Sequence, residues 1–492
     1  MRPRRLPLVA LLVTVAALAA LAAWRAACVL AGPDVDTDAY AHHMIARAIL
    51  ADPGDLAVHW VWLPLFHYAQ VPLVALGGTM DTVRWIDVGL SAALPLVLYA
   101  WVARTARAGA SQTAPEATAL LAAVIAAACP IVMQMGTTAQ PEPLFALVIL
   151  GVAIAFERRR YGWTAALLAV AVMLRYEAWA SLAVVAVLVV VEPWWRRRRG
   201  LPALPRAEGP ARAWIAVAVP VACIAAWAVL RRPVDGRWFG FLGQTRDFAN
   251  DAMHERYGLA RDLFYYPVYV AVRVMGSALP LLPFGVVRTV RQQGARFVLV
   301  LLGCLGFVSL TWIMRSSLGL DRHFVCVVPL YAVFAAQGAA AVADWIGARA
   351  GRPIVGRAVA GALAVAMLAG LGVQLHVWMG HWRASIERGW PERSALAAFV
   401  RDLPGAPRVY CDDATLEMLT GLDRRRFDRH WLDDPHTWDL VRDDASARGV
   451  VYVATWRRKM RGHEDAGDIV FSASADEGDP ATTVAVMRVG SP

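Results

Sequence analysis

The stretch LLAVAVMLRYEAWASLAVV, residues 167–185, breaks an apolar run with the polar triplet RYE at 175–177. A single helix here would cross the membrane once and place the arginine clusters at 158–160 and 196–199 on opposite faces. Such clusters collect on the cytoplasmic side of membrane proteins. We therefore predict a hairpin of two half-length helices that turns at this triplet, and spans so short survive only when packed against protein.

The rest of the chain is equally apolar. Of its 492 residues, 58% are hydrophobic and 18% are charged, and the mean hydropathy is +0.46. Soluble globular domains are much more polar. Apolar runs near twenty residues recur, each long enough to cross a hydrocarbon core as a helix. About eleven transmembrane helices are expected, near residues 7–30, 83–103, 117–134, 141–157, 163–174, 178–194, 213–230, 267–287, 297–314, 323–343 and 356–378.

Arginine-rich segments between these runs all fall on one predicted side. They are the N-terminal tail with Arg2, Arg4 and Arg5, then Arg104/Arg107, Arg158–Arg160, Arg196–Arg199, Arg288/Arg291/Arg296 and Arg349/Arg352/Arg357. By the positive-inside rule that side is cytoplasmic, so the loops at 31–82, 231–266 and 315–322 face outward. The net charge of +10 then reflects membrane topology, and we expect no nucleic-acid binding.

The C-terminal region differs in composition from the rest. From about residue 380 the long apolar runs stop and Asp and Arg increase. Strand-like stretches, GVVYVAT at 449–455 and TTVAVMRV at 482–489, accompany the helix-like DDATLEMLTGL at 412–422. Alternating apolar residues favour strands. We expect a transmembrane domain at 1–380 and a small extracytoplasmic α/β domain at 381–492.

The first outer loop, 31–82, opens with GPDVDTDAYAHHMIARAIL, which places three aspartates directly after the first helix. In a helix that begins at Asp38, His42 lies one turn further on the same face, next to His43. One interpretation is that Asp36 or Asp38 only caps an interfacial helix. Because a cap needs one acid rather than three, we favour a functional site.

Two further outward segments carry weaker signals. VHWVWLPLFHY at 58–68 is tryptophan-rich and typical of a membrane-interface belt. Together with the acidic segment it would form a shelf over the outer leaflet, beneath which a lipid-linked substrate approaches. The basic loop at 231–266 would cover a site or contact anionic lipid head groups.

Other ionisable residues are predicted on the same side. Glu142 opens the fourth helix, Arg175 and Glu177 form the hairpin tip, and Arg322 and His323 precede the tenth span. Charged residues beside membrane spans are costly and usually face cavities. Arginine suits a phosphate because its planar fork donates two parallel hydrogen bonds. The structural alternatives are a helix-start acid at Glu142 and an Arg–Glu pair that pins the hairpin.

These features, in this order and on this side, resemble the GT-C membrane glycosyltransferases. The chain is most similar to the branch that uses polyprenyl-phosphate sugars, which includes protein O-mannosyltransferases and lipid A aminoarabinose transferases. The resemblance covers roughly residues 1–380. It implies a GT-C-like α-helical polytopic fold.

The resemblance also implies an inverting hexosyl- or pentosyltransferase. An aspartate of the first outer loop then acts as general base on the acceptor hydroxyl, and Asp38 or Asp36 matches its position. Chemically, the carboxylate takes the proton while arginine offsets the charge that grows on the leaving phosphate. The expected substrate-binding residues are His42, His43, Glu142, Arg175, Glu177, Arg322 and His323. The expected partners are a polyprenyl-phosphate-linked sugar donor, a protein, lipid or glycan acceptor, and membrane lipid.

Two other functions stay open. DAYAHHMIARAIL at 38–50 also resembles the first-loop motif of oligosaccharyltransferase catalytic subunits, which implies en bloc glycan transfer, but the WWDxG motif of that family is absent from the tail. The non-enzyme alternative is a carrier or transporter of lipid-linked substrates. Such proteins place ionisable residues near the bilayer midplane, whereas the candidates here gather at one interface, which favours an enzyme.

A divalent metal ion is left open as a cofactor. Some GT-C members bind one, and Asp36, Asp38, His42 and Glu142 offer oxygen and nitrogen ligands. The six cysteines have no paired spacing, so we expect no disulfide or zinc framework. No Gly-rich nucleotide loop follows a predicted strand.

The composition also bears on the location of the protein. The preference for Ala, Arg, Val and Leu over Lys is typical of a GC-rich bacterial source. We therefore expect a multi-pass protein of the bacterial inner membrane, with a cytoplasmic N-terminus, a periplasmic C-terminal domain and undecaprenyl phosphate as the lipid carrier.

Overall fold

A computed structural model describes residues 8–106, 115–200, 210–252, 258–429, 432, 435–475 and 482–490. Arg2, Arg4, Arg5 and Arg107, used above for the topology, lie outside these residues. The chain forms two compact units. The first contains Met1–Ala31 and Ile45–Arg383, and the second contains Gly32–Met44 and Ala384–Pro492.

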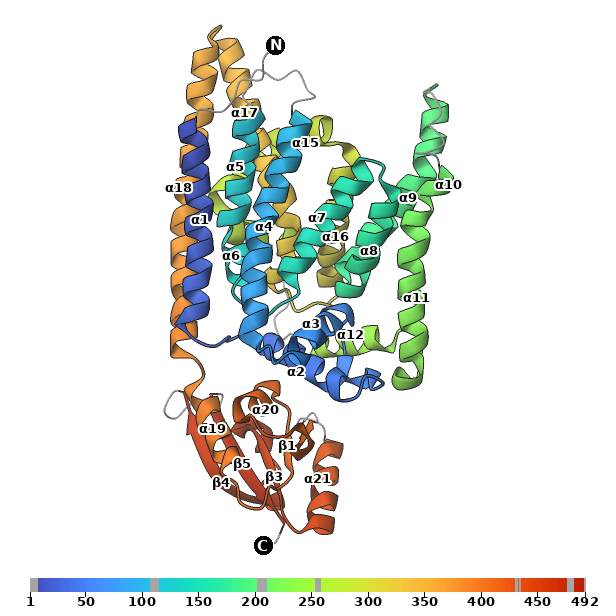
Figure 1. Cartoon of the computed structure of the whole chain (residues 1–492), viewed down its shortest axis with the longest axis vertical. Coiled ribbons are helices and arrows are strands. Elements are labelled where there is room, and N and C mark those ends of the chain that lie inside the picture. The colour runs from blue at the N-terminus through green and yellow to red at the C-terminus, as the bar shows by residue number, and fades with distance from the viewer. Residues whose placement is uncertain are drawn as a thin grey trace. The chain divides into compact units, whose positions relative to one another are not determined.

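The first unit is a bundle of helices that run nearly side by side (Figure 1). Its long elements are α1 (Leu8–Ala31), α4 (Met80–Ala106), α5 (Pro115–Ala128), α7 (Glu142–Glu157), α8 (Tyr161–Leu174), α9 (Glu177–Arg198), α11 (Ile215–Asp235), α16 (Ala295–Ile313), α17 (Val328–Arg349) and α18 (Pro353–Arg388). A further crossing is broken into α13 (Leu259–Phe264), η3 (Tyr265–Val270), α14 (Ala271–Met275), η4 (Gly276–Leu281) and α15 (Leu282–Gln293). Each of the eleven predicted spans therefore overlaps a helix.

Shorter elements connect or flank these helices. They are α2 (Thr37–Ala51), η1 (Leu56–His59), α3 (Leu65–Ala75), α6 (Pro130–Met135), α10 (Pro210–Ala213), α12 (Gly240–Ala252) and η5 (Asp321–Val327). Within the described ranges, eight helices are long and apolar enough to cross a membrane. The protein is thus a polytopic membrane protein.

The predicted helical hairpin is confirmed, because α8 ends at Leu174 and α9 begins at Glu177. With 14 residues, α8 extends only about 21 Å, less than the roughly 30 Å of a hydrocarbon core. It packs against α7 and α11. Protein contacts therefore replace the lipid contacts that a full-length helix would make.

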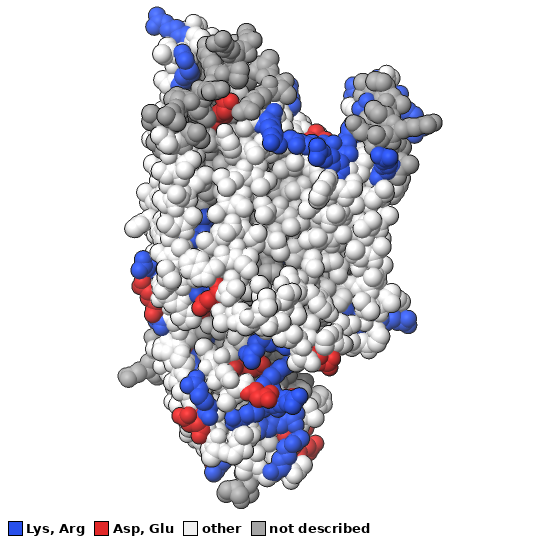
Figure 2. Space-filling view, viewed as in Figure 1, with Lys and Arg blue, Asp and Glu red and all other residues white. Residues whose placement is uncertain are grey.

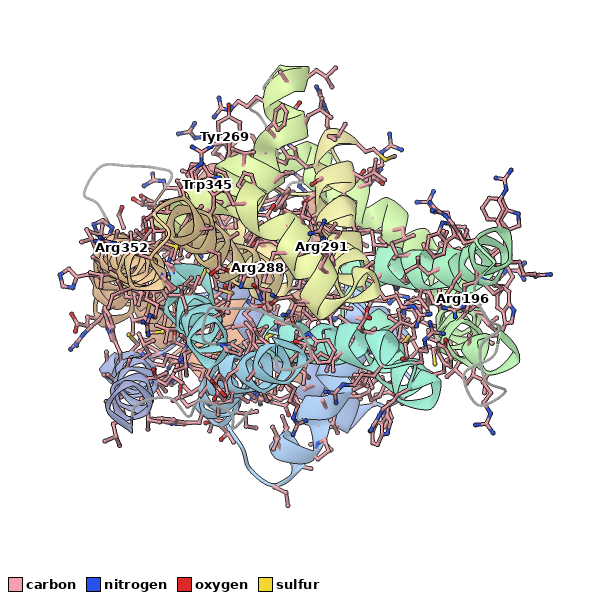
Figure 3. All side chains as sticks on the ribbon, turned by 90° about the horizontal axis from the view of Figure 1, so that it is seen from above. Arg196, Tyr269, Arg288, Arg291, Trp345 and Arg352 are labelled. Carbon is pink, nitrogen blue, oxygen red and sulfur yellow. The ribbon has the colours of Figure 1, made fainter. Side chains whose placement is uncertain are left out.

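Charged residues avoid the middle of this unit. Figure 2 shows a broad, almost entirely white band with very few charged side chains around its helices on the side in view. Figure 3 looks onto one end of the bundle, where the labelled Arg196, Arg288, Arg291 and Arg352 lie at helix ends and in the turn between α17 and α18. The assignment of this end to the cytoplasm stays a prediction.

The second unit carries a five-stranded sheet in the order β2-β1-β3-β5-β4. Its strands are β1 (Val409–Cys411), β2 (Phe427–Arg429), β3 (Val451–Trp456), β4 (Gly467–Ser474) and β5 (Thr483–Val489), and its helices are α19 (Pro391–Arg401), α20 (Ala414–Thr420) and α21 (Pro435–Arg448). Strands β2, β1 and β3 run parallel, with Tyr410 opposite Val453, and β5 is antiparallel to both β3 and β4. The two predicted strands and the predicted helix are β3, β5 and α20. The small C-terminal α/β domain is confirmed.

Close backbone contact joins α15 to α17. A Cβ atom on Gly285 would overlap the carbonyl oxygen of Phe334, and one on Gly338 would overlap that of Leu281. Membrane helices lack a hydrophobic drive to associate, so small residues that allow close packing stabilise their interfaces.

We expect Gly285→Ala to lower the free energy of unfolding by about 1–3 kcal/mol, because the added methyl group overpacks the interface. Gly306→Ala in α16 is the matched control, since its Cβ would meet no atom within 4 Å. Thermal unfolding of both variants in detergent measures the difference. Equal stability of the two variants would contradict the proposed packing.

Candidate active site

A buried cluster of charged side chains lies at the ends of several helices of the first unit. Glu142 is the first residue of α7 and Glu177 the first of α9. Arg175 lies in the two-residue turn between α8 and α9, and Arg322 and His323 belong to η5. Five of the predicted site residues are thus brought together from three separate parts of the chain.

Arg175 is the centre of this cluster. Its Nη1 donates to Glu142 Oε1 at 2.5 Å, and its Nη2 donates to Glu177 Oε1 at 2.8 Å. Its Nε contacts both carboxylate oxygens of Glu177 at 3.2 Å. One guanidinium therefore joins the starts of two helices, which a planar fork with five donors can do.

Arg322 and His323 complete the cluster from the other side. Arg322 Nε lies 3.5 Å from Glu142 Oε1, and His323 Nδ1 lies 3.4 Å from Glu177 Oε1. The side chains of Glu142 and Glu177 are 2% and 3% exposed, and those of the two arginines are 15% and 16% exposed. The carboxylates are thus enclosed, while part of each arginine stays accessible.

Glu142 keeps one oxygen for a further donor. Its Oε2 is buried and makes no hydrogen bond within the part of the chain that the structure describes. The N-terminus of α7 favours a negative charge here, but an unsatisfied buried acceptor costs free energy. A hydroxyl group of a bound substrate would satisfy it.

Aromatic packing fixes the segment that leads into η5. The ring of Tyr265 stacks on Trp312 with centroids 4.0 Å apart. The hydroxyl groups of Tyr265 and Tyr266 donate to the carbonyl oxygens of Gly319 and Leu320 at 2.8 and 3.2 Å. Trp312 was not predicted as part of this region, because it lies inside an apolar run.

The tryptophan-rich outer segment folds around a buried histidine pair. His59 Nδ1 lies 2.8 Å from His67 Nδ1, and Trp227 packs edge-on against the His59 ring. Arg231 donates to the Trp60 carbonyl at 3.0 Å and pairs with Asp235 at 2.6 Å. Burial, reinforced by the nearby charge of Arg231, lowers the pKa of His59 to about 4.

The predicted acidic residues belong to the other compact unit. Asp36 precedes α2, and its Oδ1 accepts from the backbone N–H of Asp38 at 3.0 Å, so Asp36 caps this helix. The carboxylate of Asp34 accepts from the N–H of Asp36 at 3.0 Å. His42 and His43 follow in α2, with His42 one turn beyond Asp38. These residues and the five-residue cluster therefore belong to different units.

The described residues contain no group of three or more His, Cys, Asp or Glu side chains placed to hold a metal ion. The expected ligands Asp36, Asp38 and His42 belong to one unit and Glu142 to the other. The donor set that the described residues of either unit offer does not fit a metal ion.

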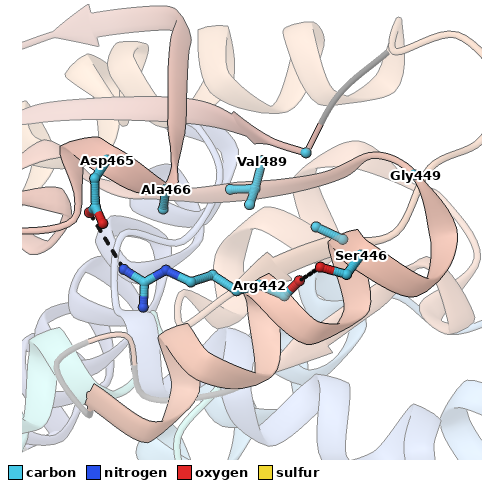
Figure 4. A pocket seen from close by; sticks show the side chains of 8 residues that line it. Arg442, Ser446, Gly449, Asp465, Ala466 and Val489 are labelled. Carbon is cyan, nitrogen blue, oxygen red and sulfur yellow. Dashed lines mark hydrogen bonds and ion pairs between the residues drawn. The ribbon is translucent and has the colours of Figure 1, made fainter.

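A cavity of about 490 Å³ lies in the C-terminal domain (Figure 4). Arg442 and Ser446 of α21 line it together with Asp465, and Arg442 Nη2 lies 3.5 Å from Asp465 Oδ1. None of the predicted site residues lines this cavity.

The protein belongs to the class of integral membrane proteins with an enclosed polar site. It has helices that cross the membrane, a polar cluster at their ends and a separate α/β domain. No protein-family model matches this chain, and no curated protein matches it. Solved structures do match it over nearly its whole length.

Two of these are crystal structures of ArnT from Cupriavidus metallidurans. One is bound to undecaprenyl phosphate (14% sequence identity, TM-score 0.57) and one is in the apo state (15%, TM-score 0.58), and each match covers 97% of both chains. A third is the archaeal oligosaccharyltransferase AglB from Archaeoglobus fulgidus, in complex with an inhibitory peptide and a dolichol-phosphate (11%, TM-score 0.52), over 92% of this chain and 70% of that one. The chain therefore has the same fold as ArnT and AglB, in line with the GT-C-like fold that the sequence predicted.

We expect Arg175→Gln to lower the free energy of unfolding by about 3–5 kcal/mol, because it removes the cation that lies nearest to both buried carboxylates. Thermal or denaturant unfolding in detergent measures this loss. Arg273→Gln is the control, since Arg273 pairs with Asp321 but is 57% exposed. Adding Glu142→Gln and Glu177→Gln to Arg175→Gln should restore part of the stability, whereas no restoration would argue against a charge effect.

The histidine pair predicts a pH dependence. The folded-state pKa of His59, about 4, is below the unfolded value of about 6.5, so the unfolded chain binds more protons between these values. The stabilisation is present above pH 6.5 and is lost as the pH falls toward 4, by up to about 3 kcal/mol.

Unfolding of wild type and His59→Gln between pH 4 and 7.5 tests this expectation. The free-energy difference between the two proteins should shrink as the pH falls through this window. A difference that is constant with pH would show that the pKa of His59 is the same in the folded and the unfolded protein.

Proposed function

We propose that this protein is an inverting glycosyltransferase that moves a sugar from a polyprenyl-phosphate donor to an acceptor hydroxyl. The cluster around Arg175, formed by Glu142, Glu177, Arg322 and His323 on a GT-C fold, carries the proposal. It combines enclosed carboxylates with partly accessible arginines. Such a set matches a substrate that presents sugar hydroxyl groups beside a phosphate.

The arginines supply the phosphate-binding part of this function. Arg175 is held by two carboxylates, so its charge is fixed in place, and Arg322 lies beside it against Glu142. As the bond between the anomeric carbon and the phosphate oxygen breaks, negative charge grows on the phosphate. Positioned cations stabilise that charge without reorganising during the reaction.

Asp38 is the proposed general base. Asp38 lies in the first turn of α2, one turn before His42, at a position that matches the base in the GT-C glycosyltransferases that the sequence resembles. In the proposed reaction Asp38 takes the proton from the acceptor hydroxyl while the acceptor oxygen attacks the anomeric carbon. The phosphate leaves with the bonding electron pair from the opposite face, so the configuration inverts.

The extent of the structural matches favours transfer of a single sugar over transfer of an oligosaccharide. This chain matches 97% of the ArnT chain but only 70% of the AglB chain. The ArnT structure is bound to undecaprenyl phosphate, and we propose the same class of lipid for this protein. The reaction would take place at the outer face of a bacterial inner membrane, with the N-terminus in the cytoplasm.

We expect Asp38→Asn to lower the rate of undecaprenyl phosphate release from its monosaccharide conjugates by at least about 100-fold, the loss typical of a missing general base. Asp36→Asn is the matched control, because asparagine caps a helix as well as aspartate does. The rate of Asp36→Asn should stay within about tenfold of the wild-type rate, as expected when the cap of α2 is preserved. A panel of sugar donors and acceptors is incubated with each purified protein, and the released lipid phosphate is quantified.

Binding of undecaprenyl phosphate should be the same for both variants, which separates loss of chemistry from loss of folding. Equal rates for Asp38→Asn and wild type would overturn the assignment of the base. A folded wild type that binds the lipid but turns over no donor would favour a carrier.

A further inference from the structure

The C-terminal domain contacts the acidic segment at residues 32–44 through a short chain of aromatic and charged side chains. We infer that Trp390 and Arg393 of this domain are positioning residues that hold Asp38 in place for the proposed transfer. This inference rests on the proposed function. It concerns only residues of the second compact unit, to which the acidic segment belongs.

Tyr40 is the contact on the acidic segment. Its hydroxyl donates to the backbone carbonyl of Asp34 at 3.0 Å. Tyr40 is the fourth residue of α2, so this bond joins the start of the helix to the turn that precedes it. Its ring lies 5.5 Å from that of Trp390, and Tyr40 is only 3% exposed. The orientation of the first turn of α2, where Asp38 lies, therefore depends on how Trp390 packs.

Trp390 is in turn fixed by Arg393. The guanidinium carbon of Arg393 lies 4.2 Å from the centre of the Trp390 ring and 5.2 Å from that of Trp456. A cation between two aromatic faces is attracted to both. Because Trp456 is the last residue of β3, this contact anchors Trp390 to the central sheet.

Polar contacts fix Arg393 as well. Its Nη1 lies 3.3 Å from Asp413 Oδ2 and 3.3 Å from Thr415 Oγ1. Asp413 caps α20 through the backbone N–H of Thr415 at 2.8 Å. Arg393 thus joins α19, α20 and β3, and a rigid part of the domain supports the tryptophan.

A second contact fixes the position of the first residue of the acidic segment. A Cβ on Gly32 would lie 2.9 Å from the carbonyl oxygen of Ile386, near the end of α18. The backbone of the segment is therefore pressed against the chain just before α19. With Tyr40 against Trp390, the segment is held at two points on either side of the aspartates.

Displacement of the general base lowers the rate of the chemical step more than it weakens binding of the donor. A displacement of about 1 Å at a catalytic group can cost about 100-fold in rate. The phosphate of the donor is proposed to bind at the Arg175 cluster, which Trp390 does not form. Loss of the positioning contact should therefore lower kcat and leave the donor KM nearly unchanged.

The test compares Trp390→Ala, Trp390→Phe and Arg393→Gln with Arg408→Gln. Arg408 packs over Tyr410 at 5.9 Å and pairs with Asp428 and Asp444, so its loss disturbs the same domain without touching the proposed chain of contacts. Steady-state release of undecaprenyl phosphate gives kcat and KM. Hydrogen exchange of the amides of residues 34–42 reports their order independently of activity.

We expect Trp390→Ala to lower kcat by roughly 10- to 100-fold, as for a misplaced catalytic group, with a donor KM within about threefold, because the phosphate-binding cluster is intact. Arg393→Gln should lower kcat by a smaller factor. Trp390→Phe should keep most of the wild-type kcat. Amides 34–42 should exchange faster in Trp390→Ala and at the wild-type rate in Arg408→Gln.

Unchanged exchange in Trp390→Ala would overturn the inference, and so would an equal loss of kcat in Arg408→Gln. If the wild type transfers no sugar, the proposed function fails, and faster exchange in Trp390→Ala alone would still establish that Trp390 orders the acidic segment.

Discussion

The charge pairing at Arg175 is the constraint on which the transmembrane structure depends. A charged side chain at membrane depth must have a partner, because water is absent. Arg175 satisfies this need with Glu142 and Glu177 together. Since these residues begin α7 and α9, one guanidinium sets the starts of two helices at the same depth. The negative charges also meet the positive ends of both helix dipoles.

This pairing explains why a helix as short as α8 is possible. Its 14 residues end where the polar cluster begins, so its C-terminal end does not face lipid. The broken crossing from Leu259 to Gln293 and the turn before η5 bring Tyr266 and Arg322 to the same region. The helix ends thus enclose a polar layer around the carboxylates of Glu142 and Glu177. Glu142 Oε2 lies in this layer as a buried acceptor that makes no hydrogen bond within the part of the chain that the structure describes.

Much of the fold could be predicted because hydrophobic length and arginine placement are strong signals. The turn at Arg175 followed from the two flanking arginine clusters, and the five ionisable residues followed from their common predicted side. The contacts of Trp390 and Arg393 could not be predicted, because they join residues far apart in the chain without any periodic pattern. Strand β4 was missed for a similar reason: its burial pattern does not alternate, and its pairing with β5 contains an irregularity at Ile469/Phe471.

The sequence also left open what the three aspartates before and within α2 do, and the local geometry gives two of them a role in ordering the backbone. An acid that caps a helix accepts a hydrogen bond from a backbone N–H group and so orders the first turn of that helix. Asp34 and Asp36 each accept such a bond. Asp38 lies two residues further, inside the first turn of α2, and its backbone N–H group donates to the cap that Asp36 provides. Three acids in five residues are therefore not redundant: two order the backbone, and the third is held by that order at a defined place.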